Sequence, residues 1–319
     1  MTYDVVALGE LLIDFTENGV SNQGNPLFEA NPGGAPCNLL AMLSKLGRRC
    51  AFIGKVGDDM FGRHLHTALQ ECGISTDALF TEPDAPTTLA FVKNAPNGER
   101  EFSFLRDNGA DIRLRAEDLP REMLQNTRIF HYGSLSMTHE GIRCATRESI
   151  ALAKESGALL SFDPNLRSAL WNAPDDARTQ IHWGLGQCDI LKIADNELTF
   201  MTGDADVLRG AEVLRRSYPN IRLLCVTAGA EGSYAFCGAA STFVPAFRLG
   251  GTIDTTGAGD TFGGCVLHYV LTHGLVLDEA SLHAMLTFAN AAAYLVTTRK
   301  GALCAMPDPA AIEAVLHQR

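Results

Sequence analysis

The segment from Asp254 to Asp260 (DTTGAGD) combines residue types that could transfer a phosphoryl group. Gly257 and Gly259 flank the small Ala258, and a helical pattern begins directly after them. Backbone N–H groups of such a turn point at one spot at a helix N-terminus, which suits a phosphate or its transition state. Asp260 could accept the proton of an attacking hydroxyl while these amides stabilise the transferred group. A capped tight turn is the alternative, but turns seldom need two aspartates, two threonines and two glycines in seven residues.

A second glycine-rich segment opens the first long helical pattern. Gly33 and Gly34 let a ligand approach the backbone closely, and Asn38 on the first turn can donate to and accept from sugar hydroxyls. Glycine-rich helix starts are common, so a purely structural role is equally plausible at this point. The segment is not a phosphate-binding Walker A loop, because GxxxxGK[ST] occurs nowhere in the sequence.

Short apolar runs alternate with helical patterns, which predicts a parallel sheet covered by helices on both faces. The predicted buried strands are Val5–Leu8, Ala51–Val56, Arg128–Tyr132, Leu159–Phe162, Ile190–Ile193 and Leu223–Thr227, with an edge hairpin of Ser233–Cys237 and Thr242–Ala246. The predicted helices include Cys37–Leu46, Phe61–Cys72, Gly141–Ser156, Gly257–Leu271 and Glu279–Val296.

Two separated regions break this rhythm. Leu11–Phe15 with Phe28–Asn31, and Thr88–Lys93 with Glu101–Leu105, have the pattern of short strands, and residues 94–98 suit a hairpin turn. These strands cannot all enter the parallel sheet without long crossovers. We therefore expect a small β lid, formed by about residues 11–31 and 87–107 and inserted into the α/β core.

Composition excludes several classes of protein. The chain has 319 residues, 46% of them hydrophobic, and a formal charge of −11. It has no apolar run long enough for a membrane span, no start resembling a secretory signal and no basic cluster for nucleic acid. Its nine cysteines show no regular spacing, so they are expected to be reduced core residues of a cytoplasmic protein.

Together the two glycine-rich segments resemble the N- and C-terminal signatures of the ribokinase/PfkB carbohydrate kinases. The first signature continues through Gly54, Gly57-Asp58-Asp59 and Phe61-Gly62, and the resemblance covers essentially the whole chain. It implies a single kinase domain over residues 1–319 with a Rossmann-like three-layer α/β/α ribokinase-like fold. It also implies ATP as phosphoryl donor, a sugar as acceptor, and a β lid that closes over the sugar and can join two copies as a homodimer.

The resemblance also implies roles for individual residues. Asp260 would be the catalytic base beside the anion hole of Gly257, Ala258 and Gly259. The sugar would be bound by Asp14, Gly33, Gly34, Asn38, Arg106 and Asn165, and the nucleotide by Lys192, Thr227, Gly229, Gly232 and Asn290. Apart from the family, Asp14 would be a solvated strand-end carboxylate, Arg106 a surface charge and Asn290 a polar group on a helix face. Asn165 has independent support, because α/β sheets bind ligands at the carboxyl ends of their strands.

Two kinds of cation are implied as well. Glu197 matches the acidic end of an NxxE motif that helps to place Mg²⁺ through water, although Ala194 replaces the first Asn. A potassium ion behind the anion hole would be held by Asp254, Thr256, Val296, Arg299 and Gly301, mostly through carbonyl oxygens.

Within the family, the bacterial fructokinases are the most similar subgroup. The resemblance includes Phe104-Leu105-Arg106, the run from His131 to Ser136 and the run from Phe162 to Arg167. It predicts phosphorylation of the 6-hydroxyl of fructose. The alternatives are a 2-keto-3-deoxygluconate kinase, another PfkB sugar or nucleoside kinase, and a sensor that binds sugar and nucleotide without chemistry. A dinucleotide-binding enzyme is disfavoured, since the first predicted strand is followed by only one glycine, Gly9.

Overall fold

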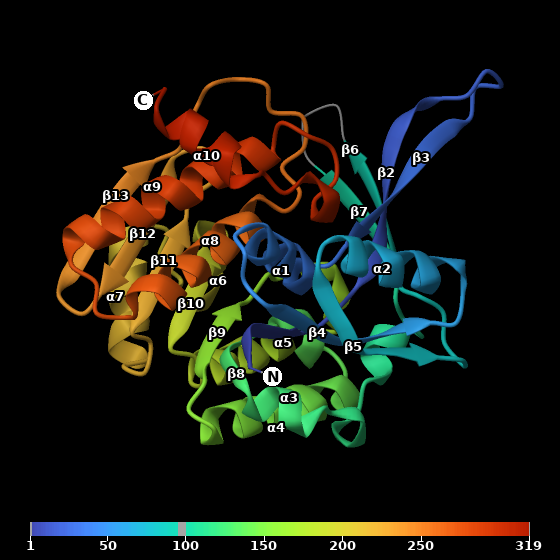
Figure 1. Cartoon of the computed structure of the whole chain (residues 1–319), viewed down its shortest axis with the longest axis horizontal. Helices are drawn as coiled ribbons and strands as arrows, with labels where there is room; N and C mark the ends of the chain where they lie inside the picture. Colours follow the sequence, from blue (N-terminus) through green and yellow to red (C-terminus); the bar gives the residue numbers. More distant parts are fainter. Residues whose placement is uncertain (1, 95–99, 319) are drawn as a thin grey trace.

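The computed structural model describes residues 2–94 and 100–318, which contain a large and a small β-sheet (Figure 1). The large sheet consists of β1 (Tyr3–Leu8), β4 (Cys50–Gly57), β5 (Ile74–Glu82), β8 (Thr127–Gly133), β9 (Leu159–Asp163), β10 (Ile190–Ala194), β11 (Leu223–Thr227), β12 (Gly232–Cys237) and β13 (Ala240–Pro245). Its spatial order is β13-β12-β11-β10-β9-β8-β1-β4-β5. All neighbours from β5 to β11 pair in parallel, and β12 and β13 form an antiparallel hairpin at one edge.

The parallel sheet and its edge hairpin are confirmed at the predicted positions. Strand β5 was not predicted, because Ser75, Thr76 and Asp77 interrupt its apolar pattern. It lies at the edge of the sheet opposite the hairpin, where such polar residues are tolerated because one side of the strand has no partner strand.

Helices cover both faces of the large sheet, as predicted. One face carries α1 (Ala35–Lys45), α2 (Met60–Glu71), α8 (Ala258–His273), α9 (Glu279–Val296) and α10 (Pro309–Leu316). The other carries α3 (Arg121–Gln125), α4 (Glu140–Glu155), α5 (Pro174–Leu185), α6 (Asp195–Thr202) and α7 (Val207–Ser217). Short 3₁₀ turns are η1 (Ala110–Arg113), η2 (Ala116–Asp118), η3 (Ser134–Met137), η4 (Ser168–Leu170) and η5 (Leu303–Ala305).

Strand β1 shows how one sheet serves two cores. Val5 and Ala7 pack into the hydrophobic cluster under α1 and α8, whereas Val6 and Leu8 pack into the cluster under α4. All four side chains are completely buried. A strand buried on both faces needs a continuous apolar run rather than an alternating one, and this is the pattern in the sequence.

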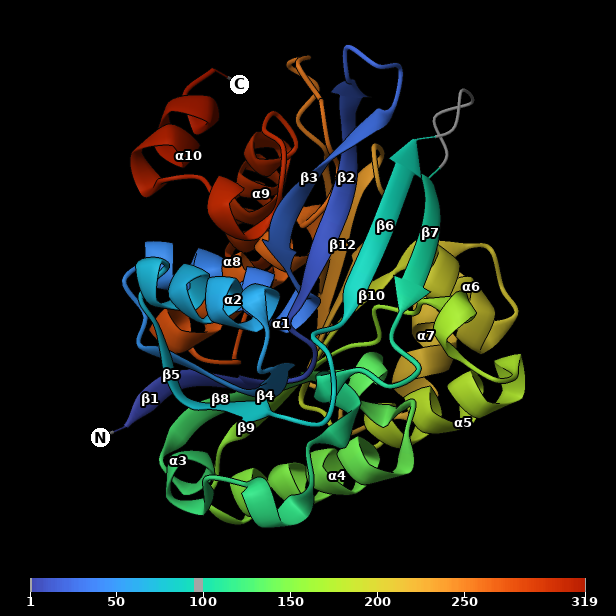
Figure 2. The same ribbon diagram turned by 90° about the vertical axis from the view of Figure 1, so that its right-hand side faces the viewer.

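The small sheet is built from the two separated segments in which extra strands were expected. It consists of β2 (Leu12–Val20), β3 (Pro26–Gly33), β6 (Leu89–Asn94) and β7 (Arg100–Leu105), in the order β3-β2-β6-β7. Figure 2 shows it standing out from the core beside α1 and α2. Phe15 of β2 stacks on Phe91 of β6 and meets Phe61 of α2 edge-on, which ties the sheet to that helix. The predicted turn at residues 94–98 falls mostly outside the described residues.

The nine cysteines are free thiols, as the sequence predicted, but only six of them are buried core residues. Cys72 is half-buried, and Cys144 and Cys304 are exposed, so the prediction that all nine lie in the core was wrong. Within the described chain, no helix combines the length and the apolar character that crossing a bilayer would require.

Two helical glycines provide a test of the packing. A Cβ at Gly62 in α2 would collide with the carbonyl oxygen of Gly57, whereas a Cβ at Gly141 in α4 would meet its nearest neighbours at an ordinary 3.7 Å. We expect Gly62→Ala to lower the free energy of unfolding by about 1–3 kcal/mol through overpacking. Gly141→Ala, the matched control, should raise it by about 0.5–1 kcal/mol because alanine favours the helix. Denaturant unfolding measures both, and equal effects of the two substitutions would contradict the packing described.

Candidate active site

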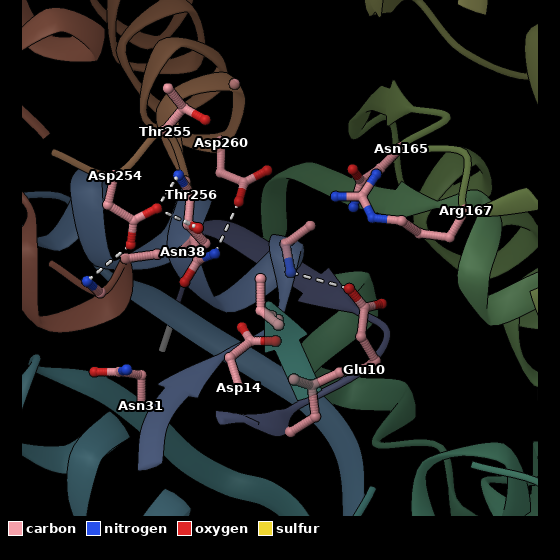
Figure 3. A pocket seen from close by; sticks show the side chains of 18 of the residues that line it. Glu10, Asp14, Asn31, Asn38, Asn165, Arg167, Asp254, Thr255, Thr256 and Asp260 are labelled. Carbon is pink, nitrogen blue, oxygen red and sulfur yellow. Dashed lines mark hydrogen bonds between the residues drawn. The ribbon is translucent and has the colours of Figure 1, made fainter. Parts of the chain in front are cut away.

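A cavity lies where the carboxyl ends of β1, β9 and β10 meet the small sheet and the N-terminus of α8 (Figure 3). Strand β1 is flanked by β4 on one side and β8 on the other, so the chain leaves the sheet in opposite directions here, which is where open α/β sheets bind ligands. The polar and charged residues lining the cavity are Glu10, Asp14, Thr16, Asn31, Asn38, Asn165, Arg167, Lys192, Asp254, Thr255, Thr256 and Asp260.

The turn before α8 has the shape that the sequence predicted. Gly257 caps the helix with a φ of +78°, and a Cβ there would lie 2.6 Å from the Cβ of Ala302. A Cβ at Gly259 would lie 2.9 Å from the Nζ of Lys192, so the missing side chain lets an ammonium group approach the helix start. The amide of Ala258 donates to the Thr255 carbonyl over a long 3.3 Å. Amides of a first helical turn lack intrahelical partners, and a phosphate can accept from them.

Asp260, in the first turn of α8, is held by a residue far away in the sequence. Its Oδ2 accepts a hydrogen bond from the Nδ2 of Asn38 at 2.8 Å. The Oδ1 of Asn38 is buried and accepts no hydrogen bond from the described residues, so it is available to a ligand hydroxyl. Burial and the charge of Asp163 raise the pKa of Asp260 to about 6, against the opposing effects of Asn38 and Lys192. A carboxyl with this pKa can accept a proton at neutral pH.

Gly33 and Gly34 shape the side of the cavity next to β2. A Cβ at Gly33 would collide with the Oδ2 of Asp14, which lies on the adjacent strand β2. Gly34 has a φ of +129°, and a Cβ there would collide with the carbonyl oxygen of Glu10. Glycine is therefore needed at both positions, because any side chain would clash with the Asp14 carboxylate or with the backbone of Glu10.

The ends of β9 and β10 contribute a charged pair. The Nζ of Lys192 lies 2.9 Å from the Oδ2 of Asp163. Burial alone would lower the pKa of Lys192, but the charges of Asp163 and Glu197 outweigh burial and raise it. The ammonium therefore stays charged beside the N-terminus of α8.

Asn165, two residues beyond β9, lies on the cavity wall in an unusual backbone conformation. Its φ is +44°, the one positive value among the described residues other than glycine, and its N–H donates to the Oδ1 of Asp163 at 3.2 Å. Asparagine tolerates this region better than most residues, and such conformations cluster at functional sites.

Glu197 does not lie on the cavity wall. Its Oε1 accepts from the N–H of Leu166 at 2.6 Å and its Oε2 from the N–H of Ala194 at 2.9 Å. The carboxylate thus joins the segment after β9 to the start of α6. The described residues contain no cluster of three or more His, Cys, Asp or Glu side chains that could hold a metal. They fit a magnesium ion that takes most of its oxygen ligands from phosphates and water.

Part of the predicted potassium site comes together. The Oδ1 of Asp254 accepts from the N–H and Oγ1 of Thr256, and its Oδ2 accepts from the N–H of Gly301 at 3.3 Å. The carbonyl of Val296 accepts from the N–H of Arg299, and neither residue lines this cavity. The Asp254 carboxylate and the Thr256 hydroxyl are oxygen ligands of the kind that a hard cation takes, but the described contacts do not bring all five predicted residues together.

A second cavity of about 720 Å³ adjoins the first, which measures about 180 Å³. Thr255 lines both, and Ala258 at the start of α8 lines the second, so the predicted anion hole lies between them. Of the predicted nucleotide contacts, Gly229 and Asn290 line the second cavity, whereas Thr227 and Gly232 do not.

Gly232 and Asn290 have structural roles beside this second cavity. Gly232 has a φ of +135°, and a Cβ there would collide with the carbonyl oxygen of Val244. The amide of Asn290 is engaged within the protein, because it accepts from Ser233 at 2.9 Å and donates to Val244 at 3.0 Å.

The structure does not bring Arg106 to the sugar cavity, contrary to the expectation that it reaches the sugar. Its side chain is buried directly after β7, and its guanidinium contacts Asp111, Thr138 and the carbonyl of Leu135. The buried guanidinium needs this carboxylate, because a buried charge left without a partner is strongly destabilising.

Among the lining or supporting residues that were not predicted as site residues are Glu10, Asp163 and Arg167. Glu10 follows β1, is buried, and accepts from the N–H of Ala35 at the start of α1. Burial raises the pKa of Glu10 to about 7. All three follow or end parallel strands at the carboxyl edge, and this position, which indicated Asn165, would have identified them too.

The chain is similar to known proteins over nearly its whole length. A model described as pfkB family carbohydrate kinase matches residues 2–309. The chain is 43% identical over 306 residues to a protein named probable fructokinase-3 from Arabidopsis thaliana, covering 95% of this chain and 88% of that protein. A fructokinase from Xylella fastidiosa with bound ATP superposes with a TM-score of 0.89 at 31% identity over 99% of each chain. A double mutant of the fructokinase from Vibrio cholerae O395, in a form with fructose, ADP and potassium ion bound, gives a TM-score of 0.87 at 31% identity, over 99% of each chain.

The raised pKa of Asp260 predicts a pH-dependent gain in stability for Asp260→Asn. Between pH 3.8, the ordinary pKa, and about 6 the native state binds a proton that the unfolded chain releases, so Asp260 stabilises the protein less as the pH rises. We expect the variant to melt at a higher temperature than the wild type at pH 8 and at a similar temperature at pH 4.

Asp278→Asn, at the start of α9, is the control with the opposite sign. A hydrogen bond from Ser281 lowers the pKa of Asp278, so any stability lost on substitution should appear at pH 8 and not at pH 3. Thermal unfolding at several pH values measures both variants. If Asp260→Asn changes the melting temperature by the same amount at every pH, the burial of the Asp260 charge is contradicted.

Proposed function

Because the chain belongs to the pfkB family of carbohydrate kinases, we propose that it transfers the γ-phosphoryl group of ATP to the 6-hydroxyl of fructose. The observation that carries this proposal is the Asp260 carboxyl, which is held by Asn38 at the N-terminus of α8, where a smaller and a larger cavity meet. A sugar in the first cavity and a nucleotide in the second would face each other across this helix end.

Each residue at this point has a chemical task. Asp260 accepts the proton of the attacking hydroxyl, and its pKa of about 6 keeps it deprotonated at neutral pH. The amides at the start of α8 and the ammonium of Lys192 stabilise negative charge on the transferred group. Asp14 and the free oxygen of Asn38 accept from sugar hydroxyls and fix the orientation of the acceptor. Magnesium, when bound with the nucleotide, supplies neutralising charge to the phosphates.

The charges around the first cavity favour a neutral ketose over a sugar acid. Four carboxyl groups line it, against two cations, Lys192 and Arg167, and Lys192 is already paired with Asp163. A substrate carboxylate such as that of 2-keto-3-deoxygluconate would meet several acidic groups, whereas fructose offers hydroxyls that donate to them. Arg106, the cation expected from the small sheet, is bound to Asp111 instead. Fructose, ADP and potassium are bound in the Vibrio cholerae relative, which supports the same ligands for this chain.

Two further features belong to this proposal. The small sheet exposes Val20, Leu27, Phe28 and Leu105, an apolar surface that supports a homodimer formed through that sheet. Nine free cysteines support a reducing compartment such as the cytoplasm.

The catalytic role of Asp260 predicts a large effect of Asp260→Asn on turnover. The amide cannot accept the hydroxyl proton, so kcat should fall about 10²–10⁴-fold. In the wild type, kcat/KM should rise with pH through about 6 as the carboxyl ionises. Coupled measurement of ADP release tests both statements, with Asp278→Asn as the control that retains activity. Near-normal turnover of Asp260→Asn would refute the assignment of the base.

A panel of acceptors at fixed ATP tests the substrate. We expect the highest kcat/KM for fructose and little activity with 2-keto-3-deoxygluconate or nucleosides, because the cavity is small and lined by acidic groups. A preference for the sugar acid would contradict the charge argument. Binding of fructose and ATP without any release of ADP would identify a sensor rather than a kinase.

A further inference from the structure

The guanidinium of Arg106 lies where the small sheet joins the core. Its Nε and Nη2 each lie 2.8 Å from the Oδ2 of Asp111. Its Nη1 donates to the Oγ1 of Thr138 at 3.0 Å, and its Nη2 donates to the carbonyl of Leu135 at 2.9 Å. Arg106 is 4% exposed and Asp111 1% exposed, so this ion pair is shielded from water.

The same carboxylate also holds the neighbouring strand. The Oδ1 of Asp111 accepts from the Oγ1 of Thr88 at 2.6 Å. Thr88 directly precedes β6, and Arg106 directly follows β7, so Asp111 holds the ends of two paired strands. Figure 2 shows that these two ends face the core. The packing is tight, because a Cβ at Gly109 would collide with Thr88 and lie 2.8 Å from the Oδ1 of Asp111.

These contacts connect two walls of the sugar cavity. Val92 of β6 and Phe104 of β7 belong to the wall on the small sheet, and Leu135 of η3 belongs to the core. Arg106 follows Phe104 by two residues and binds the carbonyl of Leu135 directly. Any displacement of this arginine would therefore move the two walls relative to each other.

We propose that Arg106 and Asp111 form a buried clamp that positions the small sheet against η3 and so sets the width of the sugar cavity without contacting the sugar. Arg106 is a positioning residue in this account. The guanidinium suits this task because its planar fork can donate to a carboxylate, a hydroxyl and a carbonyl at once, which a lysine cannot do. The statement about the sugar rests on the proposed function, whereas the statement about the small sheet does not.

The experiment compares Arg106→Met, Asp111→Asn and the double variant with Arg121→Met, which breaks an exposed ion pair to Glu148. Each of the two single variants, Arg106→Met and Asp111→Asn, leaves one buried charge without its partner and should melt at a lower temperature than the wild type. The double variant removes both charges of the pair, so it should regain most of that stability. If the clamp positions the cavity walls, the KM of the double variant for fructose should nevertheless stay about 10–100-fold above that of the wild type, while its KM for ATP is unchanged.

Amide hydrogen exchange provides a readout that does not depend on the substrate. In the double variant, exchange should be faster in residues 89–92, 103–105 and 135–138 and unchanged in α9, and Arg121→Met should behave as the wild type. If these segments of the double variant exchange at the wild-type rate, the proposed clamp is refuted, whether or not the protein phosphorylates fructose.

Kinetics separate the clamp from a direct contact between Arg106 and the sugar. The clamp predicts a raised fructose KM for Asp111→Asn as well as for Arg106→Met. A raised KM for the arginine variants combined with a wild-type KM for Asp111→Asn would show that Arg106 binds the sugar itself, and would overturn the inference. A wild-type protein inactive on fructose, with the predicted change in exchange, would refute the proposed function and leave the clamp standing.

Discussion

The hydrogen bond between Asn38 and Asp260 is the contact on which the site depends, because it joins two helix starts that are 222 residues apart in sequence. It forms only if α1 and α8 approach closely. A Cβ at Gly264 of α8 would lie 2.9 Å from the carbonyl oxygen of Leu39, and one at Gly263 would lie 3.2 Å from the Leu39 side chain. The two glycines thus allow the close packing that brings the amide of Asn38 to the carboxyl of Asp260.

The parallel sheet supplies the remaining groups. Since its strands share one direction, Glu10 after β1, Asp163 at the end of β9 and Lys192 on β10 all reach the same edge. Burial there opposes ionisation of the carboxyl groups, and Lys192 offsets part of that cost beside the helix start. The result is a cavity lined by four carboxyl groups and two cations, Lys192 and Arg167. This excess of acidic groups suits hydroxyls on the acceptor side and leaves the helix end and the ammonium of Lys192 for the phosphates.

The parallel sheet and the turn at the start of α8 could be predicted from the sequence, because both have distinctive local patterns. The strands buried on both faces give continuous apolar runs, and the turn around Gly257 has a composition that few structural turns share. Side-chain partners could not be predicted in the same way. The family resemblance assigned Arg106 to the sugar, and nothing in its local sequence reveals that Thr88 and Thr138 gather with Asp111 around it. The role of Glu197 in placing magnesium through water stays a prediction, but its contacts with the backbone amides of Leu166 and Ala194 were not foreseen. The partner of each of these side chains is determined by long-range packing and by the free-energy cost of leaving a buried charge unpaired.

A crystal structure with fructose and a non-hydrolysable ATP analogue would test the central claim most directly. The account predicts that the 6-hydroxyl lies about 2.6–3.2 Å from a carboxylate oxygen of Asp260. It also predicts that the γ-phosphate accepts from amides at the start of α8, with Asn38 still bound to Asp260. A nucleotide bound away from this helix end, or a sugar whose hydroxyls all point away from Asp260, would contradict it.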